Sequence, residues 1–366
     1  MCFKTLTPLL NRLLILTYTI IVLFTALVYI SPDIPPADLW ISAFLPYSIP
    51  FLVLTHTAVS LYLLLSKQWI GSVIPIALVL YGMSFLPQII ALNFFSPNNP
   101  EKASFSILSY NVRVFNVYEI YNNNDPEISK AIIKDAKLLD GDIKCFQEFY
   151  CDENDKTFNT IHRLSATHPY YYFEPFHVNK GGGNFGMAIF SKYPIEKKGN
   201  IHFKEKSNNQ ILYADIAIGR NIIRVFNIHL QSMHINDEQL VNAKDEKHFK
   251  HYLLKALLSY RRGAIARSKQ VDRLIQEVNR SPYPVFVCGD LNEPPLSYAY
   301  KQLSESLNNS QEKAGKGFGV THNGSIPFLR IDNQFFPKDM NIHSFKVITN
   351  KKQSDHFPLL GYYSFK

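Results

Sequence analysis

The first 95 residues carry almost no charge, and this feature constrains the fold more than any other. Their charged residues are Lys4, Arg12, Asp33, Asp38 and Lys67. A helix needs about 20 consecutive apolar residues to cross the hydrocarbon core of a membrane. The sequence therefore predicts a membrane region at residues 1–95, with three spans at about residues 13–30, 41–65 and 69–92.

Two other interpretations of this region explain less. A cleaved signal peptide would account for the first segment alone, and no small-residue cleavage site stands near Ser31-Pro32. The buried helical core of a soluble protein would need polar faces, which these segments lack. Membrane helices packed on neighbours also tolerate prolines, which the segments contain at Pro46, Pro50, Pro75 and Pro87.

The short loops of this region predict its orientation. Lys4 and Arg12 precede the first span and Lys67 lies between the second and third, whereas residues 31–40 contain no Lys or Arg. Positively charged loops stay in the cytoplasm, so the N-terminus and Lys67 are expected there. Three crossings would then place residues 96–366 outside the cytoplasm. We expect a multi-pass integral membrane protein with an extracytoplasmic domain.

The rest of the chain predicts a short polar linker at residues 96–102 and one domain at residues 103–366. Long stretches with helical spacing are few, and they occur at Ser129–Leu139 and Glu238–Arg280. Strands are expected at Phe105–Val112, Ile143–Phe146, Phe185–Phe190, Ile211–Ile218, Asn221–Leu230, Val285–Cys288, Ile331–Phe336 and Phe357–Phe365. Many strands with few intervening helices favour an α+β sandwich over a regular βαβ array.

Charge and cysteine content set weaker limits. The chain has 38 Lys and Arg against 30 Asp and Glu, and nearly all of its net charge of +8 lies after residue 95. This balance fits an anionic substrate or a membrane surface, and it fits simple solubility equally well. Four cysteines do not make a disulfide framework. Cys145 and Cys151 could oxidise outside the cytoplasm, and the sequence leaves this open.

Polar residues follow several of the predicted strands where each strand ends. Asp290 and Asn292 come directly after an apolar run, and in an extended chain residues two apart point to the same side. Further along, Asp355 stands next to His356, which suits a metal ligand beside an acid/base group. Other strand ends carry Asn111, Glu148 and His229. Together these residues predict hydrolytic phosphate chemistry.

Seven short segments place these residues in one order along the chain. They are Leu108-Ser109-Tyr110-Asn111-Val112, Cys145-Phe146-Gln147-Glu148, residues 186–195, Phe226-Asn227-Ile228-His229-Leu230, Gly289-Asp290-Leu291-Asn292, Arg330-Ile331-Asp332 and residues 354–359. In this order they resemble the endonuclease/exonuclease/phosphatase superfamily, in a membrane-anchored bacterial type. The resemblance implies the DNase I-like fold, a four-layer α/β sandwich, here preceded by the three-helix transmembrane region.

The resemblance also implies a metal site. Glu148 would be the principal metal carboxylate, with Asn111 and Asp355 nearby. Oxygen ligands of this kind suit a hard divalent ion, and Mg²⁺ or Mn²⁺ is expected as the cofactor.

The remaining residues take catalytic roles by the same resemblance. Asp290 would orient or deprotonate the attacking water, and Asn292 would hold a phosphate oxygen. His356 would contact the phosphate, while Asp332 would fix the tautomer of its imidazole. His229 takes the place from which relatives present a His or Tyr to the phosphate or leaving group.

These expectations give a leading function and two alternatives. The leading one is a membrane-anchored, metal-dependent phosphodiesterase or phosphatase that hydrolyses a phosphoester, with a phospholipid headgroup as a candidate substrate. The first alternative is an extracytoplasmic nuclease acting on nucleic acid. The second is a non-catalytic membrane protein that binds a phosphorylated ligand. Fold alone does not decide among them, and the sequence indicates no protein partner.

Overall fold

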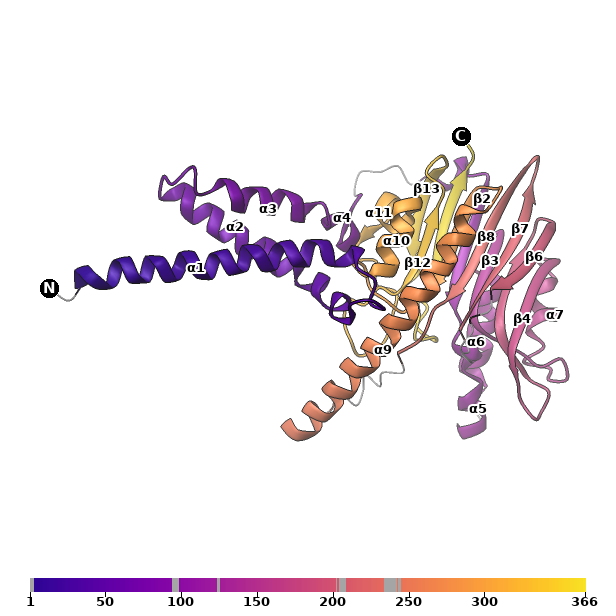
Figure 1. The fold of residues 1–366 in the computed structure, drawn as a ribbon. Helices are drawn as coiled ribbons and strands as arrows, with labels where there is room; N and C mark the ends of the chain where they lie inside the picture. Colours follow the sequence, from indigo (N-terminus) through magenta and orange to yellow (C-terminus); the bar gives the residue numbers. More distant parts are fainter. Residues whose placement is uncertain are drawn as a thin grey trace.

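Two six-stranded sheets lie face to face in the computed structural model, which describes residues 3–93, 99–123, 126–201, 203, 209–233, 242 and 245–366 (Figure 1). One sheet has the order β13-β14-β2-β3-β5-β4, and the other has the order β10-β12-β9-β8-β7-β6. The pairs β2–β3 and β8–β9 are parallel, and the other pairs in these sheets are antiparallel. The predicted α+β class is therefore confirmed.

The strands of the first sheet are β2 (Phe105–Asn111), β3 (Ile143–Cys151), β4 (Tyr170–Val178), β5 (Asn184–Ser191), β13 (Asn341–Val347) and β14 (Leu359–Ser364). Those of the second are β6 (Ile195–Ile201), β7 (Gln210–Ile218), β8 (Asn221–His229), β9 (Val285–Asp290), β10 (Asn308–Asn309) and β12 (Asp332–Phe336). The helices of this part are α5 (Val117–Asn123), α6 (Glu127–Leu138), α7 (Thr160–Ser165), α9 (Glu246–Asn279), α10 (Tyr298–Ser306) and α11 (Ser310–Ala314).

Alternation along the strands builds four layers. In β2, Phe105 and Ile107 enter the core between the two sheets, whereas Leu108 and Tyr110 pack on the opposite side with residues of α6 and α7. Strands β8 and β9 of the second sheet pack on α9 and α10 in the same way. Successive side chains of a strand point to opposite faces, so central strands such as β2 and β9 are buried on both faces. The predicted four-layer sandwich is confirmed.

Several predicted elements differ from the structure at their ends, and strands β4, β6 and β13 were not among the expected strands. Strand β3 continues through Gln147 and Glu148, because a register shift between Phe146 and Phe149 keeps it paired with β5. Helix α9 begins at Glu246, and most of the predicted stretch before it lies outside the described residues. Strand β6 was not predicted, since its exposed residues follow one another without a period of two.

Gly289 allows the close pairing of β8 and β9. Its φ is +138°, and a Cβ there would lie 2.1 Å from the carbonyl oxygen of Ile228. We expect Gly289→Ala to destabilise the fold by about 3 kcal/mol, because backbone strain and the clash add. Gly219→Ala is the matched control, since its φ is +62° and no atom lies within 4 Å of the added carbon. Equal melting temperatures of the two variants would contradict this prediction.

The N-terminal region consists of α1 (Phe3–Ile30), α2 (Ile49–Leu65), α3 (Val73–Met83) and α4 (Leu86–Ile89). Two segments of the described residues are helical, long and apolar enough to cross a membrane, Leu9–Asp33 and Leu45–Leu65. Figure 1 shows α1, α2 and α3 extending side by side away from the sheets.

The third predicted span, at residues 69–92, is wrong as a single membrane helix. Helix α3 has 11 residues and ends at Met83. The ring of Pro87 would clash with the carbonyl of residue 83 in a continuous helix, so the chain breaks there. Beyond α4, the strand β1 (Ala91–Leu92) pairs with β11 (Lys316–Gly317). The last residues of the predicted span, Ala91 and Leu92, are therefore paired with a strand of the sandwich domain.

Further contacts fasten the N-terminal region to the sandwich domain. Leu296, in the loop after β9, packs in one apolar cluster with Val28, Ile49 and other N-terminal residues. The Lys301 Nζ lies 3.0 Å from the Asp33 Oδ1. The two parts therefore share a core.

Candidate active site

Strand register brings the predicted polar residues to one edge of the sandwich. In the first sheet Asn111 pairs with Gln147, so Glu148 follows one position later. In the second sheet Asp290 pairs with both His229 and Asp332. The side-chain nitrogen of Asn111 donates to the Asp290 Oδ2 at 3.3 Å, which joins the two sheets at this edge.

Asp290 lies at the centre of the cluster. Its Oδ2 is 3.8 Å from the His229 Nε2 and 3.9 Å from the His356 Nε2. Its Oδ1 accepts the backbone N–H of Asn292 at 2.7 Å. Burial, and next the negative charge of Asp332, raise the pKa of Asp290 to about 6. A carboxyl with a pKa near neutrality is suited to exchange protons with a substrate or a water.

His356 is held by Asp332. The His356 Nδ1 lies 2.8 Å from the Asp332 Oδ2, and the backbone N–H of Asp332 donates to the Thr321 hydroxyl at 3.0 Å. Burial lowers the pKa of His356, but the adjacent charge of Asp332 outweighs burial and holds this pKa well above its usual value. The ring is therefore positively charged at neutral pH, and its Nε2 faces Asp290.

Glu148 stands on the other side of Asp290. Its φ is +49°, a left-handed conformation at the register shift of β3. The Glu148 Oε1 accepts a hydrogen bond from the Asn111 side chain at 3.4 Å and lies 3.8 Å from the His229 Nε2. Burial, and then the charge of Asp355, raise the pKa of Glu148. A strained backbone at a cluster of polar side chains is a common mark of a functional site.

The side chain of Asn292 is buried and makes a structural contact that the sequence did not suggest. Its side-chain nitrogen donates to the carbonyl of Leu230 at 3.0 Å, and its φ is +51°. The neighbouring Glu293 is buried, and its Oε1 lies 2.9 Å from the Arg267 Nε. The amide of Asn292 thus anchors the loop after β9 to the end of β8.

Two residues of the cluster were not predicted. The Arg113 Nε lies 3.4 Å from the Asp355 Oδ2, at the start of four successive residues with φ between +46° and +57°. The spacing of Arg113, two residues after Asn111, was the available signal. The ring of His322 lies 5.2 Å from that of His356, and the two residues form an isolated β-bridge. No strand pattern surrounds His322, so nothing in the sequence indicated that it lies at the site.

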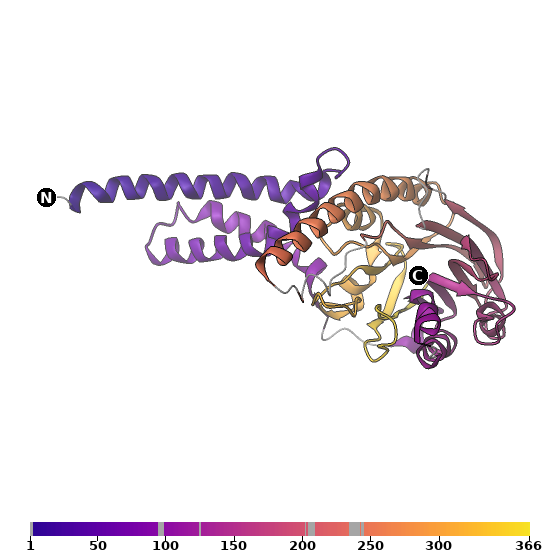
Figure 2. The ribbon, with the colours of Figure 1, turned by 90° about the horizontal axis from the view of Figure 1, so that it is seen from below.

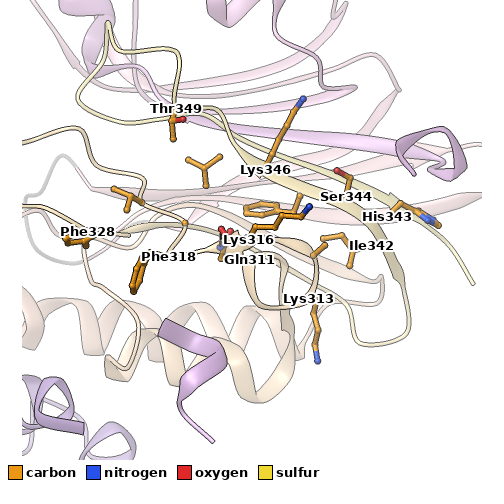
Figure 3. Close-up of a pocket in the computed structure, with 15 residues that line it drawn as sticks. Gln311, Lys313, Lys316, Phe318, Phe328, Ile342, His343, Ser344, Lys346 and Thr349 are labelled. Atoms are coloured by element: carbon orange, nitrogen blue, oxygen red, sulfur yellow. Dashed lines mark hydrogen bonds between the residues drawn. The ribbon is translucent and has the colours of Figure 1, made fainter. Parts of the chain in front are cut away.

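A hollow of about 600 Å³ lies next to this cluster, between β13 and the segment around α11 (Figure 3). Its lining includes Lys313, Lys316 and Lys346, and the rings of Phe318 and Phe328 lie 5.5 Å apart at its margin. None of the predicted site residues lines it. The cluster is the candidate site, and the hollow is a basic surface beside it.

Cys145, Cys151 and Cys288 are buried and free. Cys145 and Cys151, whose pairing the sequence left open, therefore form no disulfide with each other in this structure.

The raised pKa of Asp290 predicts a pH-dependent stability. The folded protein holds this proton more tightly than the unfolded chain, so without metal its free energy of unfolding falls as pH rises from about 4 to about 6. A shift of two pKa units corresponds to about 3 kcal/mol. Asp290→Asn removes this dependence, so its melting temperature in EDTA should exceed that of the wild type increasingly across this window. A constant difference from pH 4 to 7 would contradict the prediction.

Two family models match parts of this chain. The model described as Endonuclease/Exonuclease/phosphatase family matches residues 108–356. This chain belongs to that family. A separate match, described as a domain of unknown function, covers residues 11–89. No curated protein matches the chain.

Solved structures similar to this family member include the catalytic domain of human Nocturnin with bound sulfate, at 18% identity and TM-score 0.49, covering 72% of this chain and 93% of that one. A mannosyl-6-phosphatase of Bacteroides thetaiotaomicron matches at 16% identity and TM-score 0.49, over 71% and 100%. An endonuclease/exonuclease/phosphatase of Beutenbergia cavernae matches at 14% identity and TM-score 0.49, over 71% of each chain.

Members of the endonuclease/exonuclease/phosphatase family are hydrolases of phosphoesters and generally use divalent metal ions. The residues of this chain fit such an ion. The negative charge of Asp355 contributes to the raised pKa of Glu148, and a divalent cation between the two carboxylates would relieve this repulsion. Among the described residues, the groups with possible ligand atoms within 4.8 Å of one another are His322 with Asp355 and His356, and Asp290 with Asp332 and His356. Glu148 belongs to neither group.

Proposed function

We propose that this chain is a membrane-anchored, metal-dependent phosphoesterase that hydrolyses its substrate by attack of a water held by Asp290. The observation that carries the proposal is the position of the buried Asp290 carboxylate between two imidazoles, at 3.8 and 3.9 Å. Burying a carboxylate is costly, and a buried one between two imidazoles at the end of β9 is typical of a functional site.

The side chains of the site then divide the reaction among them. Asp290, ionised above a pH of about 6, accepts a proton as the water oxygen bonds to phosphorus and the bond to the leaving oxygen breaks. The charged His356 donates from Nε2 to a phosphoryl oxygen, and Asp332 keeps the proton on Nδ1. His229 faces the same space and interacts with the phosphate or the leaving oxygen. Asn292 holds the loop and a phosphate oxygen.

Glu148 and Asp355, with Asn111, are the residues that would hold the metal, which we propose is Mg²⁺ or Mn²⁺. Their oxygen atoms suit hard divalent cations. When bound, the ion supplies positive charge that stabilises the negative phosphoryl oxygens and the leaving oxygen.

Metal removal tests the metal site. We expect EDTA to reduce hydrolysis of bis-p-nitrophenyl phosphate by the full-length protein at least about 100-fold, and Mg²⁺ or Mn²⁺ to restore it. Glu148→Gln should remain inactive at metal concentrations that restore the wild type. Glu196→Gln, an exposed glutamate on β6, is the control and should keep full activity. Unchanged turnover in EDTA would exclude the metal role.

The proposed substrate is a phosphoester at the membrane surface, with a phospholipid headgroup ahead of nucleic acid. The shared core between the N-terminal helices and the sandwich supports this choice, because it keeps the site near the bilayer. The test compares phospholipid, nucleic-acid and small phosphoester substrates with the full-length protein in nanodiscs. Cleavage of nucleic acid that weakens steeply with salt would favour the nuclease instead. No metal-dependent cleavage of any substrate would favour the non-catalytic alternative.

We further propose that the catalytic domain lies outside the cytoplasm, with α1 and α2 crossing the membrane and the broken segment of α3 and α4 returning beside them toward the sheets (Figure 1). The start of α1 and the turn between α2 and α3, which carries Lys67, both lie at the end of the helices away from the sheets (Figure 2). Positively charged loops remain in the cytoplasm. In intact cells, an impermeant maleimide should therefore label Leu138→Cys in α6 and spare Lys67→Cys. The reverse labelling would overturn the orientation.

A further inference from the structure

The N-terminal part of α9 projects beyond the sandwich and exposes an apolar surface. Figures 1 and 2 show the start of this helix extending away from the sheets. Its large apolar side chains here are exposed, with Leu254 at 59% and Phe249 at 45%. The other exposed members are Leu253, Leu257 and Leu258. A contiguous exposed apolar patch of this kind marks an interaction site, and we call these five residues the α9 stripe.

Basic residues accompany the α9 stripe. They are Lys247, Lys250, Lys255, Arg261 and Arg262, against the single acidic residue Glu246 within this part of the helix. Helices that lie in the plane of a membrane combine large apolar side chains with Lys and Arg in this way. Anionic lipid headgroups attract the basic residues. A second copy of the chain would bring the same positive charges together, which disfavours self-association through this surface.

The α9 stripe is continuous with an interface that faces the proposed membrane region. Tyr260 follows Leu257 by three positions, so both lie on one side of the helix. The Tyr260 hydroxyl is 2.7 Å from that of Tyr47, and its ring is 5.0 Å from that of Phe44. Phe44 ends the segment that joins the two candidate spans, and Tyr47 lies at the start of the second span. The side of α9 that meets this segment therefore continues outward as the exposed stripe.

The part of α9 that follows the stripe contacts the chain segment that leaves the candidate active site. Strand β8 ends at His229, and the chain then runs along α9. The Arg267 Nη1 donates to the carbonyl of Gln231 at 2.7 Å, and the Ser259 hydroxyl donates to the carbonyl of Met233. Ser259 directly follows Leu258, the last residue of the stripe. A surface held by the stripe would thus be linked through α9 to the segment that follows His229.

We propose that the α9 stripe inserts into the boundary between headgroups and acyl chains of an anionic phospholipid bilayer. This is the same membrane that α1 and α2 are proposed to cross, so the inference rests on that anchoring. It adds a lipid-binding surface to the catalytic domain itself. With the stripe inserted, the domain has a fixed side toward the bilayer, and the site opens beside the lipid surface.

A fluorescence experiment on the full-length protein tests this proposal. Bimane is attached at Leu254→Cys in a Cys2→Ser background, since the other three cysteines are buried, and the protein is placed in nanodiscs of phosphatidylcholine and phosphatidylglycerol. We expect a doxyl-labelled lipid to quench this probe several-fold more strongly than a probe at Leu138→Cys, and iodide to quench it less. Leu138 is the matched control because it is 64% exposed on α6.

A probe at Leu16→Cys, exposed on α1, separates the two ideas. Lipid quenching at positions 16 and 254 supports the proposal. A decrease in lipid quenching at position 254 after Lys250→Glu and Lys255→Glu supports a role of the basic residues in lipid binding. Lipid quenching at position 16 but not at 254 overturns the proposal and leaves the anchoring intact. Protection of position 254 from both quenchers also overturns it, in favour of a protein partner or a second copy. Absence of lipid quenching at position 16 overturns the anchoring together with the proposal.

Discussion

Asp290→Asn is expected to reduce phosphoester hydrolysis by roughly 10²–10⁴-fold, which is the range for losing a general base. The amide cannot accept the proton of the attacking water, although its oxygen can still accept the backbone N–H of Asn292. The measurement is metal-dependent release of p-nitrophenol from bis-p-nitrophenyl phosphate by purified full-length protein. Its melting temperature, taken on the same preparation, shows that the variant is folded.

Asp339→Asn is the matched control for this prediction, because Asp339 is an exposed aspartate in the turn before β13. It should keep the activity of the wild type. Near-wild-type turnover by folded Asp290→Asn would exclude a catalytic role for Asp290 and, with it, the proposed mechanism. Loss of activity with a collapsed melting temperature would instead point to a structural role for this carboxylate.

His356→Ala should have a comparable effect, about 10²–10³-fold, the usual cost of removing one donor to a developing negative charge. The variant also leaves the buried Asp332 without its ionic partner, so some destabilisation is expected. His356→Gln keeps a hydrogen-bond donor and should recover stability more than activity. The measurements are turnover and melting temperature, with His162→Ala as a control because His162 is exposed on α7.

Asp332→Asn separates charge from packing at this histidine. Asp332 raises the pKa of His356, so its loss lowers that pKa and the imidazole becomes neutral at a lower pH. The alkaline limb of the pH–rate profile should therefore move to lower pH in Asp332→Asn. An unmoved alkaline limb would show that the charge on His356 has no part in the reaction.

Much of the sandwich could be predicted from the sequence, because its central strands are buried on one or both faces and read as apolar runs. Strand β9 is an example, with Val285 and Val287 packing against α9 while Phe286 and Cys288 enter the core between the sheets. Edge strand β6 lacked such a pattern. The third span was wrong because apolar composition over residues 69–92 hides the break that Pro87 imposes and the pairing of β1 with β11.

The candidate site was predictable where polar residues end buried strands. Parallel pairing carries Asn111 and Glu148 to one edge of a sheet, and His229 and Asp290 to the matching edge of the other. The sequence could not show His322, whose place depends on a bridge to His356 between two irregular segments. It also could not show that Arg113 pairs with Asp355, because that contact depends on the left-handed backbone after Asn111.

The pairing of β1 with β11 has a consequence for how substrate reaches this protein. A catalytic domain joined to a membrane anchor by a flexible linker samples many heights and orientations above the bilayer. Here the sandwich domain is fixed to the N-terminal helices by three contacts. They are the pairing of β1 with β11, a shared apolar cluster and an ion pair. If the chain is anchored as proposed, the site would sample one height and one tilt above the membrane. Lateral diffusion in the membrane plane, rather than reach into solution, would then govern which phosphoesters it encounters.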